Sequence, residues 1–263
     1  MSLIRHAFLP ALAAVFLFAS QSAIAATSAE MAAGNALLSR YADAIVTVEL
    51  VAVIPSTSGT PQERRVETNA TVISSGGLTL TSLGQIDPRL GGTGGGGRGG
   101  RGGGFGSGDT EFKEVKLRFA DNTEVAARVL LKDADLDLAF IAPEIGAADM
   151  REFVHVDLEQ AADAAILGTY YDITRVTKLL QRAPIVQMST IIGIVERPRR
   201  VIIADQHTIG CPLFDADGRV LGFSLRYYSG GAPIGSVIVP AIDVADMARQ
   251  ATDLMQAGIP GAL

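Results

Sequence analysis

The chain has 263 residues, of which 48% are hydrophobic and 19% charged; this composition excludes an intrinsically disordered protein and fits a globular one. Its formal net charge of −6 lacks the basic excess of proteins that bind nucleic acid or anionic membranes. The single cysteine, Cys211, excludes an internal disulfide, so the core alone must stabilise the fold.

The first 25 residues are typical of a secretory signal peptide. Arg5 supplies the positive end, an apolar run covers residues 7–19, and Ala23-Ile24-Ala25 forms a small-residue cleavage site. The alternative, an uncleaved membrane anchor, is disfavoured because the run is short for a membrane span and contains Pro10. We therefore expect cleavage near Ala25 and a periplasmic or secreted protein that is not embedded in a membrane.

The mature part begins with an expected helix over residues 26–43, in which Met31, Leu37 and Tyr41 recur at helical spacing. Six segments rich in β-branched residues then predict strands. These strands are expected at residues 44–54, 67–74, 78–82, 115–119, 124–131 and 137–141.

Residues 91–108 interrupt this first run of strands with 13 glycines among 18 residues. Such a segment cannot bury enough apolar surface to offset its chain entropy, so we expect a disordered loop that acts as a flexible spacer. Arg98 and Arg101 leave open an Arg-Gly-Gly segment that binds nucleic acid, but two arginines in an acidic, exported protein give that alternative little support.

A second run of strands follows Pro143, and a final helix begins near Asp243 and ends before Gly258. The second run is expected at residues 153–156, 164–167, 185–195, 200–203, 219–225 and 235–239. A dozen short strands in two runs favour an all-β fold of two barrels or sandwiches, with one unit over residues 44–150 and the other over residues 151–263.

Several stretches resemble motifs of trypsin-like proteases. Residues 205–218 resemble the nucleophile loop, which reads Gly-Asn/Asp-Ser-Gly-Gly-Pro-Leu before a turn and a strand. Residues 70–82 resemble the run that leads to the catalytic histidine, residues 115–141 the hairpin before the Asp-Leu-Ala-Val-Leu motif, and residues 233–242 the last strand. From Ala44 to Gly258 the chain thus resembles the protease domain of the HtrA (Deg) family. The resemblance implies two six-stranded antiparallel β-barrels with an N-terminal and a C-terminal helix, and no PDZ module is expected within the 263 residues.

The resemblance places the triad aspartate on Asp137, which is kept. The histidine position falls on Gly84 and the serine position on Ile209, so the general base and the nucleophile are both absent. Removing either group from such a triad costs about a million-fold in turnover. Asp137 then has a structural interpretation, as a carboxylate that bonds backbone or hydroxyl groups near Ser82.

In the loop that resembles the nucleophile loop, His207 and Thr208 replace the usual Gly and Asn/Asp, while Gly210 is kept. The resemblance assigns the oxyanion-hole N–H groups to His207 and Ile209, and a non-glycine residue at position 207 is expected to disturb the hole. Cys211 is an alternative nucleophile, with His207 as its base. A lone cysteine in an apolar stretch is nevertheless more typical of a small core residue.

Two functions remain open from the sequence. The first is an exported, non-catalytic pseudoprotease that binds peptides or unfolded envelope proteins by strand addition, or that acts as a scaffold. The alternative is a periplasmic, HtrA-like serine endopeptidase with a non-standard site, in which Thr208 or Ser82 acts as nucleophile. No cofactor or metal is expected, no nucleic acid is an expected partner, and the resemblance leaves a homo-oligomer open.

Overall fold

The computed structural model describes residues 26–56, 59–90, 109–144, 152–229 and 232–258. The predicted signal peptide and the predicted glycine-rich loop lie outside these residues, and so does the predicted boundary near residue 150. None of the described helices is both long and apolar enough to cross a membrane.

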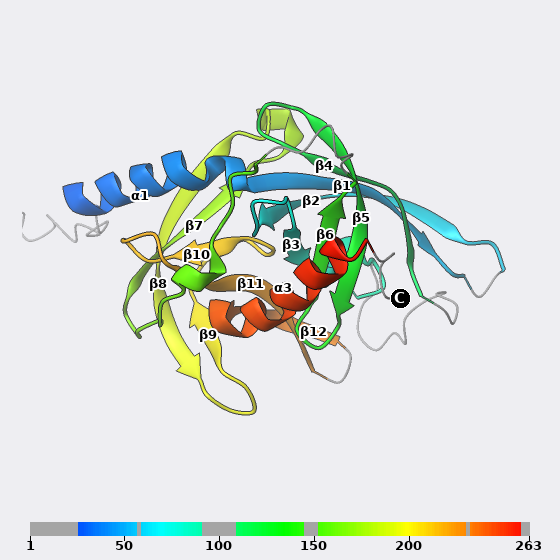
Figure 1. The fold of residues 1–263 in the computed structure, drawn as a ribbon. Helices are drawn as coiled ribbons and strands as arrows, with labels where there is room; N and C mark the ends of the chain where they lie inside the picture. Colours follow the sequence, from blue (N-terminus) through cyan, green and yellow to red (C-terminus); the bar gives the residue numbers. More distant parts are fainter. Residues whose placement is uncertain (1–25, 57–58, 91–108, 145–151, 230–231, 259–263) are drawn as a thin grey trace, which may run out of the picture.

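The described strands form two closed, six-stranded antiparallel barrels, which confirms the predicted fold class (Figure 1). The strand order around the first barrel is β1-β2-β3-β6-β5-β4, and around the second it is β10-β11-β12-β9-β8-β7. The first barrel contains β1 (Ile45–Ile54), β2 (Gln62–Val72), β3 (Thr79–Ser82), β4 (Glu111–Arg118), β5 (Glu124–Asp133) and β6 (Leu138–Pro143). The second contains β7 (Thr169–Arg175), β8 (Pro184–Val195), β9 (Val201–Ala204), β10 (Pro212–Phe214), β11 (Val220–Ser229) and β12 (Ala232–Pro240).

Helices lie at both ends of the described chain, and short helical turns connect some of the strands. The helical elements are α1 (Ser28–Tyr41), η1 (Ala42–Ala44), α2 (Leu83–Ile86), η3 (Leu158–Gln160), η4 (Lys178–Leu180) and α3 (Ala241–Gln256). Thr27 and Glu30 form a capping box that fixes the start of α1. At the other end of α1, Tyr41 stacks on Phe214 with ring centroids 4.4 Å apart, which holds the helix against the second barrel.

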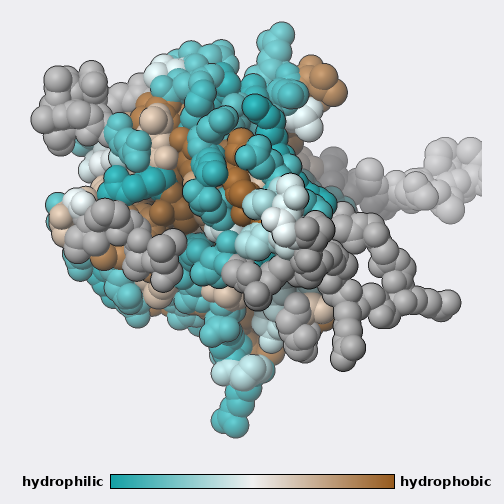
Figure 2. Space-filling model, turned by 90° about the vertical axis from the view of Figure 1, so that its right-hand side faces the viewer, coloured by the Kyte–Doolittle hydropathy of each residue, from teal (hydrophilic) through white to brown (hydrophobic). Residues whose placement is uncertain are grey.

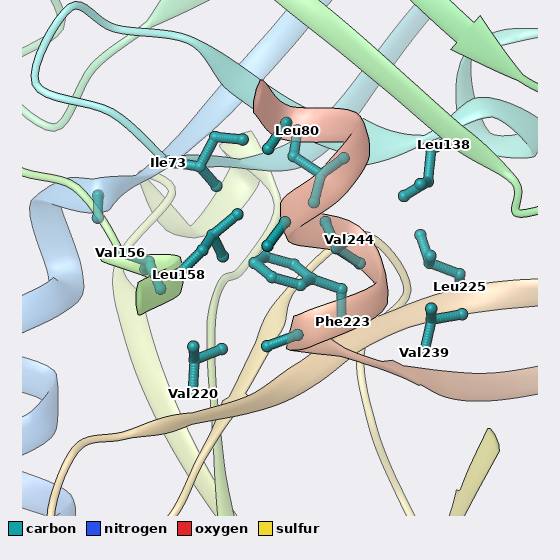
Figure 3. Close-up of a cluster of buried hydrophobic side chains, with 14 of the residues drawn as sticks. Ile73, Leu80, Leu138, Val156, Leu158, Val220, Phe223, Leu225, Val239 and Val244 are labelled. Atoms are coloured by element: carbon teal, nitrogen blue, oxygen red, sulfur yellow. The ribbon is translucent and has the colours of Figure 1, made fainter. Parts of the chain in front are cut away.

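Helix α3 covers the seam between the two barrels (Figures 1 and 3). Its buried Val244 lies in a cluster that includes Leu80 and Leu138 of the first barrel and Phe223 and Val239 of the second (Figure 3). Each such fully buried side chain stabilises the fold by roughly 1.5–3 kcal/mol. The shared core therefore joins the barrels into one packed unit.

Polar side chains fix the same interface. The buried guanidinium of Arg175 on β7 donates from Nε to Ile45 O at 2.5 Å and from Nη2 to Ala42 O at 2.6 Å. Asn69 on β2 donates from Nδ2 to Thr174 Oγ1 at 2.9 Å and to Arg175 O at 2.8 Å. These bonds set the position of β7 against the first barrel, and the loop at residues 205–211 lies beside that contact.

The first two predicted strands of the second barrel are wrong. Residues 153–156 are extended but belong to no strand, because Phe153 N and Val156 N donate to carbonyl groups of the first barrel and its loops. Residues 164–167 end in a turn in which Leu167 has a φ of 65°.

In place of the two wrongly predicted strands, the second barrel contains β7 and β10. The sequence did not reveal β7 because Asp172 and Arg175, both buried, interrupt its apolar pattern. It did not reveal β10 because that strand has three residues and lies inside the segment interpreted as a loop.

Candidate functional site

Asp137 lies at the turn before β6 with its side chain fully buried. Its carboxyl accepts hydrogen bonds from Ser82 Oγ at 2.5 Å, Gly84 N at 2.7 Å and Arg226 N at 2.7 Å. The hydroxyl of Tyr228 lies 3.3 Å from its Oδ1. The expected contact with Ser82 is therefore present. Two residues of β11 also bond Asp137: Arg226 through its backbone N–H and Tyr228 through its hydroxyl.

Burial raises the pKa of the Asp137 carboxyl above its ordinary value, and the hydrogen bonds from Ser82, Arg226, Gly84 and Tyr228 offset part of that rise. Burial also raises the pKa of the Tyr228 hydroxyl, and the neighbouring Asp137 raises it further. The hydroxyl of Tyr228 thus keeps its proton and acts as a donor to Asp137.

Gly84 has no room for a side chain. A Cβ built on this residue would meet the Tyr228 hydroxyl, would lie 2.7 Å from Arg226 Cδ and would lie 3.0 Å from Asp137 Oδ1. The space beside Asp137 is therefore filled by two β11 side chains, through the hydroxyl of Tyr228 and the stem of Arg226. The sequence did not reveal Arg226 and Tyr228, because the expected strand ended at residue 225 whereas β11 continues to Ser229.

The loop at residues 205–211 is fixed at Gly210. Its N–H donates to Ser224 O at 2.7 Å, and Ser224 N donates to Cys211 O at 3.0 Å. Gly210 has a φ of 85°, and a Cβ there would lie 3.0 Å from Asn69 O and 3.1 Å from Thr81 Oγ1. Both its backbone conformation and its contact with the first barrel require glycine at this position.

The buried carboxyl of Asp172 bonds the backbone of the same loop. Asp172 on β7 is fully buried, and its Oδ2 accepts a hydrogen bond from Thr208 N at 2.7 Å. Its Oδ1 has no hydrogen-bond partner in the described part of the chain. Burial raises the pKa of Asp172 to about 6, against the opposing effect of the bonds from Thr208.

His207 faces Ser224 and not Asp137. Its Nδ1 lies 2.5 Å from Ser224 Oγ, and burial lowers the pKa of its imidazole. Ser224 is fully buried on β11. His155 is also absent from the site, because its ring nitrogen contacts Phe153 O at 3.0 Å.

Cys211 is fully buried and donates from Sγ to Thr174 Oγ1 at 3.3 Å. Burial raises the pKa of its thiol, and the nearby charge of Asp172 raises it further. The thiol is therefore protonated at neutral pH, whereas a nucleophile would need the thiolate.

Two cavities beside these residues form one cleft between the barrels. One, of about 460 Å³, is lined by Ile209, Thr208 and Leu179 among others, and the second, of about 270 Å³, is lined by Gly84 and Arg226 among others. Glu67 and Gln85 line both cavities, which places the two end to end. Ile209 is partly exposed, and the N–H groups of His207 and Ile209 donate to no acceptor among the described residues.

Of the predicted site residues, Gly84, Thr208 and Ile209 line this cleft. Asp137 lies behind Gly84, whose N–H it accepts, and His207 and Gly210 flank Thr208 and Ile209 in the loop. Cys211 lies behind the loop in the core of the second barrel. No three His, Cys, Asp or Glu side chains gather to hold a metal within the ranges that the structure describes.

No protein-family model and no curated protein matches the sequence. Among solved structures, the fold is similar to the MamO protease domain of Magnetospirillum magneticum, with 14% identity, a TM-score of 0.51, and coverage of 79% of this chain and 97% of that one. It is also similar to the HtrA-type protease AlgW with a decapeptide, with 15% identity, a TM-score of 0.56, and coverage of 83% of this chain and 66% of that one. The chain therefore has the trypsin-like fold of two β-barrels found in HtrA-type protease domains.

Proposed function

We propose that the protein is an exported, non-catalytic member of the trypsin-like fold that binds extended peptide in the cleft between its barrels. The observation that carries this proposal lies beside Asp137. Where the resemblance places the general base, Gly84 stands with no room for a side chain, and the hydroxyl of Tyr228 and the stem of Arg226 fill the space. Without an imidazole at this position, no side chain next to Asp137 can accept a proton from a nucleophile.

The residues that could replace the absent serine make structural contacts. Ser82 is buried and donates its hydroxyl to Asp137, and Thr208 donates its backbone N–H to Asp172 Oδ2 at 2.7 Å. Cys211 is buried and protonated. Each contact is that of a structural residue, which supports binding without hydrolysis.

The cleft keeps features suited to an extended peptide. Ile209 presents apolar surface to the cavity of about 460 Å³, and the unpaired N–H groups of His207 and Ile209 can donate to a peptide carbonyl. The similar AlgW structure contains a decapeptide, which gives peptide binding on this fold a precedent. The export part of the proposal rests on residues 1–25, and homo-oligomer formation stays a prediction.

The binding part is tested with fluorescein-labelled, unfolded β-casein and fluorescence anisotropy. I209D puts a charge into the cleft and should weaken binding at least tenfold, because an unpaired carboxylate in the interface is costly. I192D is the matched control, an exposed isoleucine on β8 that lines neither cavity of the cleft, and it should bind casein as the parent does. Equal affinity of all three proteins would place the binding site elsewhere.

One observation favours the second candidate, a serine endopeptidase with a non-standard site. His207 Nδ1 and Ser224 Oγ lie 2.5 Å apart, the spacing of a base and a nucleophile. Ser224 is fully buried, however, so a substrate carbonyl has no access to its hydroxyl. A fluorophosphonate probe decides between the two functions: labelling that is lost in S224A would establish the endopeptidase, and no labelling of the folded parent protein is expected.

A further inference from the structure

A groove of about 750 Å³ opens between β4 and β5 in the wall of the first barrel, and it shares no lining residue with either cavity of the cleft. The two strands pair only where Lys116, Leu117 and Arg118 meet Ala126, Val125 and Glu124. Strand β4 nevertheless begins at Glu111, and β5 continues to Asp133. Figure 2 views the molecule from the side on which these strands lie in Figure 1, and shows hydrophobic surface recessed between hydrophilic side chains.

An irregularity in each strand accounts for the opening. The register between β1 and β4 shifts around Glu114, whose φ of 50° is a conformation that non-glycine residues rarely adopt. The register between β5 and β6 shifts around Leu130. Extra residues of this kind bend a strand and end its pairing, and they are frequent next to functional sites. Both shifts lie at the groove, since Glu114 and Leu130 line it.

The groove presents main-chain groups that lack a partner among the strands that the structure describes. On β5 the free edge covers Ala127–Lys132, about 20 Å at 3.3 Å per residue, and on β4 it covers Glu111–Val115. In addition, Arg128 Nε is buried and donates to no acceptor in the described residues. Free strand edges are templates for another extended chain, because buried N–H and C=O groups require partners.

The side chains of the groove select the kind of chain. Phe112, Val115 and Leu130 give it an apolar wall, which suits alternate apolar side chains of an extended segment. Four carboxylates and three cationic side chains also line it, so its charges nearly balance. This balance favours an uncharged occupant over an acidic or a basic one.

We propose that the groove between β4 and β5 is a second peptide-binding site, which takes an uncharged, extended segment of about six residues by strand addition. The main chain of the segment pairs with the free edges of both strands, and one of its carbonyl groups accepts the hydrogen bond from Arg128 Nε. The proposal is independent of the cleft, because the residues of the two sites differ.

The test uses a fluorescein-labelled heptapeptide of alternating threonine and valine, blocked at both ends, and the mature protein. We expect saturable binding, and hydrogen exchange should show new protection of those amides in residues 111–115 and 127–132 that point into the groove and do not pair with β1 or β6. The same peptide with N-methylated valines cannot donate from those residues, and should bind at least tenfold more weakly.

Two matched variants locate the site. R128M removes the unpaired donor and keeps an apolar stem, and should weaken binding about three- to tenfold. R249M makes the same change on α3, outside the groove and both cavities of the cleft, and should leave binding unchanged. Equal binding of the N-methylated peptide, or no saturable binding of the parent peptide, would overturn the proposal. The proposal would also be overturned if amides that point into the groove were already protected without peptide. Protection that rises with protein concentration would assign the groove to a second copy of the chain. Protection that is independent of concentration would assign it to a segment of the chain itself.

Discussion

Replacing Asp172 with asparagine should make the protein more stable, relative to the parent, as the pH rises. The carboxyl is fully buried, one of its oxygens has no hydrogen-bond partner in the described residues, and its pKa rises from an ordinary value of 3.8 to about 6. The folded state therefore binds this proton more tightly than the unfolded state does. The resulting stabilisation is complete below the unfolded pKa and is lost as the pH rises through about 6.

The magnitude follows from the shift. One pKa unit corresponds to about 1.4 kcal/mol, so a shift of about two units costs the folded parent about 3 kcal/mol once Asp172 is ionised. Asparagine carries no charge at any of these pH values, and its side-chain oxygen can still accept the bond from Thr208 N. Between pH 4 and pH 8, the difference in unfolding free energy should move by about 2 to 3 kcal/mol in favour of D172N.

Urea unfolding of the parent, D172N and D205N at pH 4, 6 and 8 measures these differences. D205N makes the same substitution at an exposed residue of the same loop, and serves as the control for loss of a surface carboxylate. A flat D172N difference would contradict this prediction and would mean that Asp172 is solvated or paired in the folded protein. A difference that moves the other way would indicate a cationic partner.

Three further predictions concern the residues around the cleft. Cys211 should resist alkylation by iodoacetamide in the native protein and react fully in urea, because its thiol is buried and protonated. G84H should lose about 1–3 kcal/mol of unfolding free energy, because the new side chain collides with Tyr228. G84H combined with I209S should still not cleave casein, and cleavage by this double variant would show that the position of the general base has room for an imidazole. Y228F removes a donor to Asp137 and should lower the unfolding free energy by about 1 kcal/mol, measured by urea unfolding; no loss would mean that the hydroxyl does not support Asp137.

The regular elements of the first barrel were accessible from the sequence because their side chains follow simple patterns. Its β-branched segments correspond to β1, β2, β3, β4, β5 and β6 within a few residues at their ends. Strand β7 could not be predicted from the sequence, because tertiary contacts, and not a hydrophobic pattern, stabilise it. Arg175 is buried only because carbonyl groups of Ala42 and Ile45 accept its donors, and those groups are about 130 residues away in the chain.

Part of the candidate site could likewise be predicted from the sequence, and part could not. The resemblance predicted a site at Asp137, Gly84 and the loop around Ile209, and the structure confirms the expected contact of Asp137 with Ser82. The filling of the space at Gly84 could not be predicted, since it depends on how far the side chains of Arg226 and Tyr228 reach across the interface from β11. The same limit holds for Asp172, whose support of Thr208 requires two segments 36 residues apart to meet.

In the proposed function, the cleft binds peptide and does not cleave it. Mass spectrometry of unfolded casein after prolonged incubation with a saturating amount of the mature protein tests this most directly, with I209D as the binding-deficient control. We expect casein to be recovered intact, and the protein to carry no covalent fragment while anisotropy shows the complex. New casein termini that appear with the parent and disappear with I209D would contradict it.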